Sequence, residues 1–129
     1  MANKALPQFL LGAGVVAALA AGFWLIGGPE VARTENRDQK RMSDLHSLQG
    51  HVTCLARTKG KALPQVLDET RDCPAPQLTD RFTDDPYRYA RLSDTAYEIC
   101  AEFELPDRLH TSSRFDAETG CLHGSYTPD

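Results

Sequence analysis

One uncharged apolar stretch near the N-terminus constrains this chain more than any other feature. Residues 6–26, LPQFLLGAGVVAALAAGFWLI, contain no charge, and Gln8 is their one strongly polar residue. A helix of these 21 residues is long enough to cross a hydrocarbon core of about 30 Å. Phe23 and Trp24 lie at its distal end, where aromatic side chains favour the membrane interface. The stretch predicts a transmembrane signal anchor in residues 1–28 and an extracytoplasmic domain in residues 29–129.

A cleaved secretory signal peptide is the alternative interpretation of this stretch. Lys4 precedes it, and Ala18-Leu19-Ala20 has the small residues of a cleavage site. The apolar core of a signal peptide is typically about 7–15 residues long. This stretch is longer and continues beyond Ala20, which favours an uncleaved anchor in a bacterial inner membrane.

The end of the stretch looks like the cleavage site of a prepilin, where a peptidase cuts between glycine and phenylalanine. The matching residues are GFWLI, 22–26. In a prepilin, however, the apolar helix follows the cut, whereas here most of it precedes Gly22. Gly27 stands where an acidic residue is expected, and Gly27-Gly28-Pro29 interrupts the long helix that pilins pack into a filament. The sequence therefore predicts that prepilin processing does not occur.

Small residues are frequent within the predicted membrane helix. Small side chains let two membrane helices approach closely. An ordinary lone anchor, in which such residues are also common, is the alternative. The residues that we expect to form a packing surface are Gly12, Gly14, Ala17, Ala18, Ala21 and Gly22.

The cysteines indicate disulfides in an oxidising compartment. There are four, Cys54, Cys73, Cys100 and Cys121, an even number in a small domain. A Cys54–Cys73 bond would close a loop of about 20 residues and contribute about 3 kcal/mol. A Cys100–Cys121 bond would join the last two predicted strands. Four cysteines allow three pairings, and the sequence alone does not choose among them.

Charge gives a weaker and partly opposite signal. Arg33, Arg37, Lys40 and Arg41 follow the span, and positive residues favour the cytoplasmic side. The predicted disulfides favour the periplasm instead, and we predict a periplasmic C-terminal domain. The net charge of −4 argues against a nucleic-acid partner.

Periodicity predicts an amphipathic helix that ends near Lys59-Gly60, where glycine suits a C-cap. A short helix is expected around residues 63–67. The apolar face of the long helix consists of Met42, Leu45, Leu48, Val52 and Leu55, and its polar face carries Arg37, Lys40, Arg41, Asp44 and Gln49.

Three strands are expected downstream of this helix. Tyr87 and Tyr89 alternate with polar or small residues, and Ser93-Asp94 predicts a turn. Alternation then runs from Tyr97 to Phe103, and residues 121–126 suit a final strand after a loop at 112–120. The predicted fold class is α+β: one N-terminal transmembrane helix, then an amphipathic helix packed on a small antiparallel sheet.

Residues 37–104 resemble the globular domain of type II secretion pseudopilins, and more closely a group of uncharacterised single-pass bacterial membrane proteins. The resemblance implies the fold and no catalytic residues. It is carried by the order and spacing of Arg41, Asp44, Leu45, Leu48, Gly60, Leu63, Pro64, Leu67, Asp85, Pro86, Tyr87, Tyr89, Tyr97, Cys100 and Phe103.

No motif for catalysis is evident. The chain lacks a haem-attachment motif, a nucleotide-binding loop and a nucleophile elbow. His51, Cys54, Cys121 and His123 are candidates for a zinc site, for which disulfides are the alternative. Asp116 and Glu118 are candidates for a calcium site, for which an ordinary loop is the alternative. We expect no enzyme activity, no catalytic residue, no metal site and no cofactor.

These observations favour a non-catalytic accessory or assembly subunit of a larger membrane complex, for example a respiratory or transport assembly. Its expected partners are integral membrane subunits and the lipid bilayer. One alternative is a pseudopilin-like component of a secretion or filament machine. Another is a periplasmic sensor that binds a metal or ligand.

Overall fold

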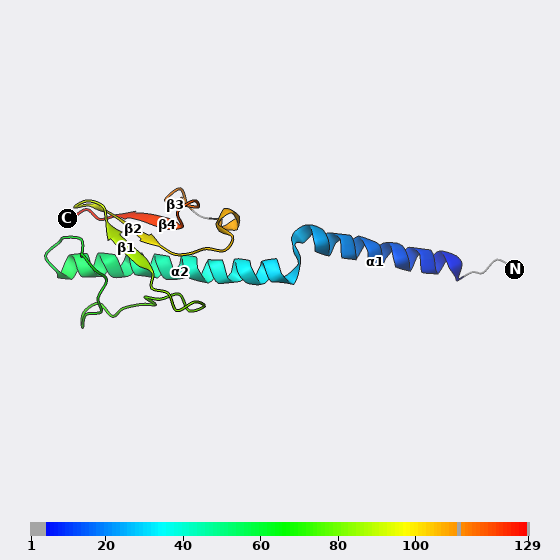
Figure 1. Ribbon diagram of the computed structural model, residues 1–129, viewed down its shortest axis with the longest axis horizontal. Helices are drawn as coiled ribbons and strands as arrows, with labels where there is room; N and C mark the ends of the chain where they lie inside the picture. The colour runs from blue at the N-terminus through cyan, green and yellow to red at the C-terminus, as the bar shows by residue number, and fades with distance from the viewer. Residues whose placement is uncertain (1–4, 111, 129) are drawn as a thin grey trace. The chain divides into compact units, whose positions relative to one another are not determined.

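The computed structural model describes residues 5–110 and 112–128 and has the predicted α+β class (Figure 1). The chain forms two compact units, Met1–Arg33 and Thr34–Asp129. The first unit holds the helix α1 (Leu6–Ile26) and the start of α2 (Gly28–Thr58), and the second holds the rest of α2 and a four-stranded sheet.

Glycines end both helices. Gly27 follows α1 with a φ of 94°, in the left-handed region, and a Cβ there would lie 2.9 Å from a methyl of Val31. Gly60 follows α2 with a φ of 90°. The interruption at Gly27 and the end near Gly60 confirm the two predicted breaks.

The N-terminal helical segment has the length and composition of a membrane span. In Leu6–Thr58, the most apolar window of 18 residues has a mean hydropathy of 2.3 and contains no buried residue. Near an N-terminus, a membrane anchor and a signal sequence both have these properties. No other helix in the described part of the chain passes the same test.

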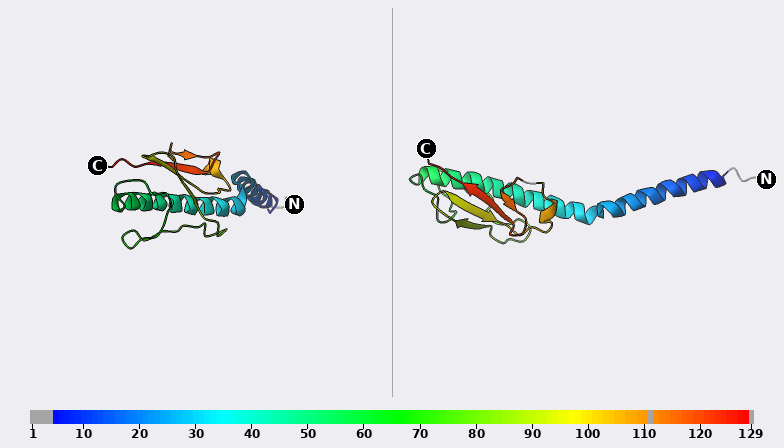
Figure 2. Two further views of the ribbon diagram at one scale, coloured as in Figure 1. Left: turned by 60° about the vertical axis from the view of Figure 1, so that its left-hand side comes forward. Right: turned by 90° about the horizontal axis from the view of Figure 1, so that it is seen from above.

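The sheet is antiparallel throughout (Figure 2). Its strands are β1 (Arg88–Arg91), β2 (Ala96–Cys100), β3 (Phe115–Asp116) and β4 (Cys121–Ser125), in the order β1-β2-β4-β3. A 3₁₀ turn, η1 (Pro106–Arg108), lies between β2 and β3. The three predicted strands are confirmed, and the short β3 was not predicted.

The core lies between α2 and one face of the sheet. Met42, Leu45, Leu48 and Val52 of α2 are buried, as their spacing predicted. They belong to one apolar cluster with Tyr97, Ile99 and Leu122 of the sheet.

Glycine at position 124 is required where the Tyr97 ring crosses β4. Tyr97 and Gly124 are register partners, and a Cβ at position 124 would come within 2.3 Å of the ring. Gly124 therefore leaves the space into which the buried Tyr97 ring packs.

The segment 59–87 contains no helix, so the expected short helix around 63–67 is wrong. In Figure 1 the start of this segment loops over the end of α2, and the rest runs below α2 before it enters β1. The carbonyl of Pro64 accepts a hydrogen bond from the Tyr89 hydroxyl, and that of Leu63 accepts one from Arg91. These carbonyls bond to β1 side chains, which holds the segment in an extended path.

Candidate functional site

The predicted packing surface lies on α1, where most of its residues share one side of the helix. At about 100° per residue, Gly14, Ala17, Ala18, Ala21 and Gly22 span an arc of about 140°. Gly12 lies on the opposite side. A Cβ added at Gly12, Gly14 or Gly22 would meet no atom within 4 Å. Gly14, Ala18 and Gly22 follow one another at four-residue steps, the spacing of small residues in close membrane-helix pairs.

Both disulfides join segments that are distant in the sequence. Cys54 of α2 is bonded to Cys73 in the 59–87 segment, and Cys100 of β2 is bonded to Cys121 of β4. All four cysteines are paired, and none is free. Of the three pairings open to the sequence, this is the one observed, and it fits a disulfide-stabilised domain in an oxidising compartment.

The most buried polar site is built around Arg41. The guanidinium donates to Asp38 at 2.7 Å, to Asp80 at 2.5 Å and to Glu104 at 3.0 Å. Asp38 also accepts from the backbone N–H groups of Glu104, at 3.1 Å, and Leu105, at 2.6 Å. The Arg41 cluster, defined as Asp38, Arg41, Asp80 and Glu104, thus fastens two chain segments to α2.

This cluster corrects the predicted polar face of the long helix. Arg41 and Asp44 were expected to face solvent, but their exposed fractions are 2% and 7%. The segments around Asp80 and Glu104 cover that side of α2, and helical periodicity carries no information about segments so distant in sequence. β2 ends at Cys100 although alternation continues to Phe103, and beyond the strand the N–H groups of Glu104 and Leu105 donate to Asp38.

Ion pairing shifts the pKa values of Glu104 and Arg41 in this cluster. Hydrogen bonds from Arg37 and then Arg41 lower the pKa of Glu104 to about 2. Burial lowers the pKa of Arg41, but its bonds to Asp80, Asp38 and Glu104 outweigh burial and raise it. In the described residues, no buried side-chain nitrogen or oxygen lacks a hydrogen-bond partner. This cluster therefore offers structural cross-links, without a free base or nucleophile.

Asp44 forms a second link between α2 and the rest of its unit. Its carboxylate accepts from Arg81 at 2.7 Å and from the Tyr87 hydroxyl at 2.9 Å. Burial of the phenol, followed by the bond to Asp44, raises the pKa of Tyr87. Tyr87 is thus a neutral hydrogen-bond donor, consistent with a core role.

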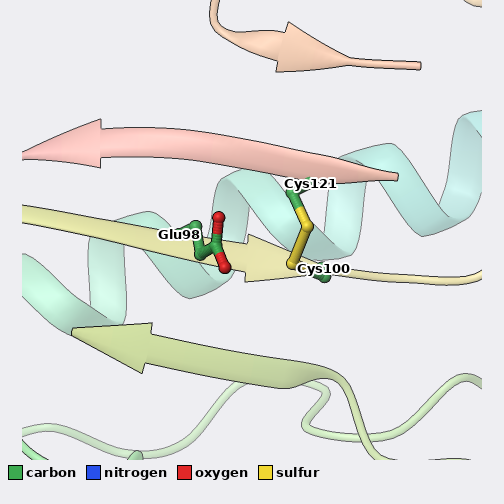
Figure 3. Close-up of side chains that lie close together, drawn as sticks. All are labelled: Glu98, Cys100 and Cys121. Carbon is green, nitrogen blue, oxygen red and sulfur yellow. A yellow bond between two sulfur atoms is a disulfide. The ribbon is translucent and has the colours of Figure 1, made fainter. Parts of the chain in front are cut away.

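One group of metal-ligand types lies on the outer face of the sheet, away from α2 (Figure 3). A carboxylate oxygen of Glu98 and the Sγ atoms of Cys100 and Cys121 all lie within 4.8 Å of one another. The two sulfurs are bonded to each other. Sequence reasoning missed this group because it depends on the register of β2 against β4.

The zinc and calcium sets considered from the sequence are not formed. Cys54 and Cys121 belong to different disulfides, and a ring nitrogen of His51 contacts the carbonyl of Asp68 at 3.1 Å. Asp116 accepts the N–H of Glu118 at 2.9 Å, and this bond contributes most to lowering the Asp116 pKa. That carboxylate caps a turn.

No family model, curated protein or solved structure matches this chain.

Proposed function

We propose that this protein is a non-catalytic, single-pass accessory subunit of a larger membrane complex, anchored by α1 with its second unit in the periplasm. The observation that carries the proposal is an exposed, uncharged, membrane-length helix with small residues on one side. It is followed by a small unit with two disulfides.

The surface of α1 supports membrane insertion and a helix partner. No residue of α1 is buried, and Leu11, Leu19 and Trp24 are 72%, 67% and 88% exposed. Apolar surface of this extent is stable in lipid or against another apolar helix. The Gly14-Ala18-Gly22 row then offers the side on which a partner helix comes closest.

The second unit supports a binding role rather than catalysis. Its buried polar groups are Asp38, Arg41, Asp44, His51 and Asp80. Each has a hydrogen bond to another part of the unit. The charges therefore fix the shape of the unit, and a rigid shape suits a docking module.

The compartment is inferred from the disulfides. Stable disulfides form in the periplasm and are rare in the cytosol. We give this inference more weight than the opposite signal from the positive residues that follow α1.

The test is a mild-detergent pull-down of the tagged native protein, with mass spectrometry of the retained proteins and of the intact bait. A stoichiometric set of membrane subunits and an uncut bait are expected. A bait cut after Gly22 and bound to secretion-machine proteins would instead support the pseudopilin-like alternative. The packing of α2 on an antiparallel sheet favours that alternative. A bait cut after Ala20 and recovered in the soluble fraction would contradict both.

Paired variants locate the interface on α1. Gly14→Leu/Ala18→Leu places two large side chains on the small-residue side, and the retained subunits are expected to be lost. Gly12→Leu, on the opposite side, is the matched control and should retain them. If both variants retain the membrane subunits equally, α1 does not form the interface through its small-residue side.

A further inference from the structure

Four side chains on the outer face of the sheet form two directly facing pairs across β2 and β4. Cys100 faces Cys121, and Glu98 faces His123 one step along the strands. Alternate residues of β2 and β4, Tyr97, Ile99 and Leu122, lie in the core beneath α2. Because side chains alternate between the faces of a sheet, both pairs share the face opposite the helix, as Figure 3 shows for Glu98 and the two cysteines.

The backbone ladder brings these pairs close together. The N–H of Ala101 donates to Gly120, and that of Tyr126 donates to Thr95. By alternation, Cys100/Cys121 and Glu98/His123 are then non-hydrogen-bonded pairs, in which facing side chains approach most closely. Ring nitrogen Nδ1 of His123 is 3.7 Å from the Oε2 atom of Glu98. A carboxylate oxygen of Glu98 lies within 4.8 Å of both sulfurs.

We propose that reduction of the Cys100–Cys121 disulfide creates a zinc site on this face. Zinc in proteins takes four ligands from thiolate, imidazole and carboxylate groups. Reduction leaves one such group on each of four adjacent positions of two paired strands. The ligand set is Glu98, Cys100, Cys121 and His123.

The chemistry balances with a dithiol as the reductant. The dithiol supplies two electrons and two protons, the bond between the two Sγ atoms breaks, and the reductant becomes a disulfide. Zn²⁺ then replaces the two thiol protons, which leave to solvent, while Glu98 and neutral His123 bind without redox change. Reoxidation reverses the sequence: the two thiolates give up two electrons to an oxidised dithiol, re-form the bond and release the ion.

The surroundings favour a cation once the bond is broken. Cys100 and Cys121 are 4% and 5% exposed, so two thiolates beside the Glu98 carboxylate would carry like charges with little solvation. A divalent ion removes this repulsion. A cavity of about 270 Å³ is lined in part by Arg88, Cys100 and Glu102.

The experiment uses the full chain in detergent, reduced with a phosphine and desalted without oxygen. Co²⁺ is added as a spectroscopic probe, and Zn²⁺ is then used to displace it. We expect one ion per chain, sulfur-to-cobalt charge-transfer absorption, tetrahedral visible bands and release of two protons. The oxidised chain should show none of these signals. Absence of the charge-transfer band after reduction would overturn the proposal.

Three variants assign the signal. Cys100→Ser/Cys121→Ser should abolish it, and Cys54→Ser/Cys73→Ser should leave it intact. Glu98→Gln/His123→Gln keeps every cysteine and should weaken metal affinity by at least about tenfold. Unchanged affinity in this last variant would mean that the four-ligand site does not exist. Loss of the folded circular dichroism spectrum on reduction, not restored by Zn²⁺, would also refute the site, because it requires the β2–β4 register.

Discussion

At the scale of single residues, Arg41 links α2 to two distant segments of the second unit. It contacts carboxylates from α2, from the 59–87 segment and from the segment after β2. Three acidic partners offset the free-energy cost of burying the charge of Arg41. The guanidinium in turn offsets the cost of removing their carboxylates from water. Removal of a buried ion-pair partner leaves charges without compensation.

We therefore expect Arg41→Met to destabilise the protein by about 3–5 kcal/mol. Methionine approximates the length of the arginine stem but leaves Asp38 and Asp80 buried without a cation. The measurement is urea denaturation of the full chain in detergent, followed by circular dichroism. Arg33→Met is the control, because Arg33 forms an exposed pair with Glu30 and should change stability by less than about 1 kcal/mol. Equal effects of the two substitutions would show that burial in the cluster does not matter.

Glu104 makes the stability of the native protein depend on pH in acid. Its pKa falls from 4.5 to about 2 on folding, because Arg37 and then Arg41 bond to its carboxylate. A lowered pKa contributes stability above the unfolded value, and this contribution is lost as pH falls through the folded value. Native protein should thus exceed Glu104→Gln in urea midpoint at pH 7, and the difference should shrink between pH about 4.5 and about 2. A difference independent of pH would contradict this origin.

At the scale of elements, the disulfides and the ion pairs substitute for secondary structure in the 59–87 segment. That segment has one isolated backbone bridge, Thr79–Pro86, and no helix. Cys73 fastens its middle to α2, and Asp80 and Arg81 fasten its end. Few backbone hydrogen bonds within the segment mean that its order depends on these attachments.

Cys54→Ser/Cys73→Ser is consequently expected to lower stability by about 3 kcal/mol and to open this segment. Limited trypsin digestion with mass mapping should show faster cleavage at Lys59, Lys61 and Arg71, which lie within or beside the released loop. Cys100→Ser/Cys121→Ser, which affects only the sheet, is the comparison and should not accelerate cleavage there. Matching cleavage patterns in the two variants would argue that global unfolding, rather than local release, is being measured.

The elements that could be predicted from the sequence are those determined by patterns among neighbouring residues. The apolar periodicity from Met42 to Leu55 and the alternation around Tyr97 each depend on near neighbours, and both helix ends carry glycine. Burial of Arg41 and Asp44 depends on segments about 40–60 residues away, so no local sequence pattern could predict it.

The same distinction holds for the candidate sites. The cysteines were identifiable as disulfide partners from their number, but their pairing was open. The pairing of Glu98 with His123 requires the register of two strands more than 20 residues apart, which sequence alone did not supply.

At the scale of the whole molecule, the division into two units separates the membrane-length helix from the stabilising interactions. The apolar cluster around Leu45, both disulfides and the Arg41 cluster all belong to Thr34–Asp129. The first unit contributes exposed apolar surface instead. The proposed function assigns the membrane anchor and the contact with partner helices to the first unit, which makes the two units separable by experiment.

We expect the fragment 34–129, exported to the periplasm behind a cleavable signal, to fold with both disulfides and to match the urea midpoint of the full chain. Every stabilising group named above is retained, whereas residues before Thr34 supply none of them. A fragment beginning at residue 29 is the matched comparison, since it tests the boundary predicted from Gly27-Gly28-Pro29. If α1 supplies the membrane contact, neither fragment should retain integral membrane subunits in the pull-down, although both are folded. A folded fragment that still retains them would move the interface from α1 to the periplasmic unit, and an aggregated fragment would show that the second unit depends on the first.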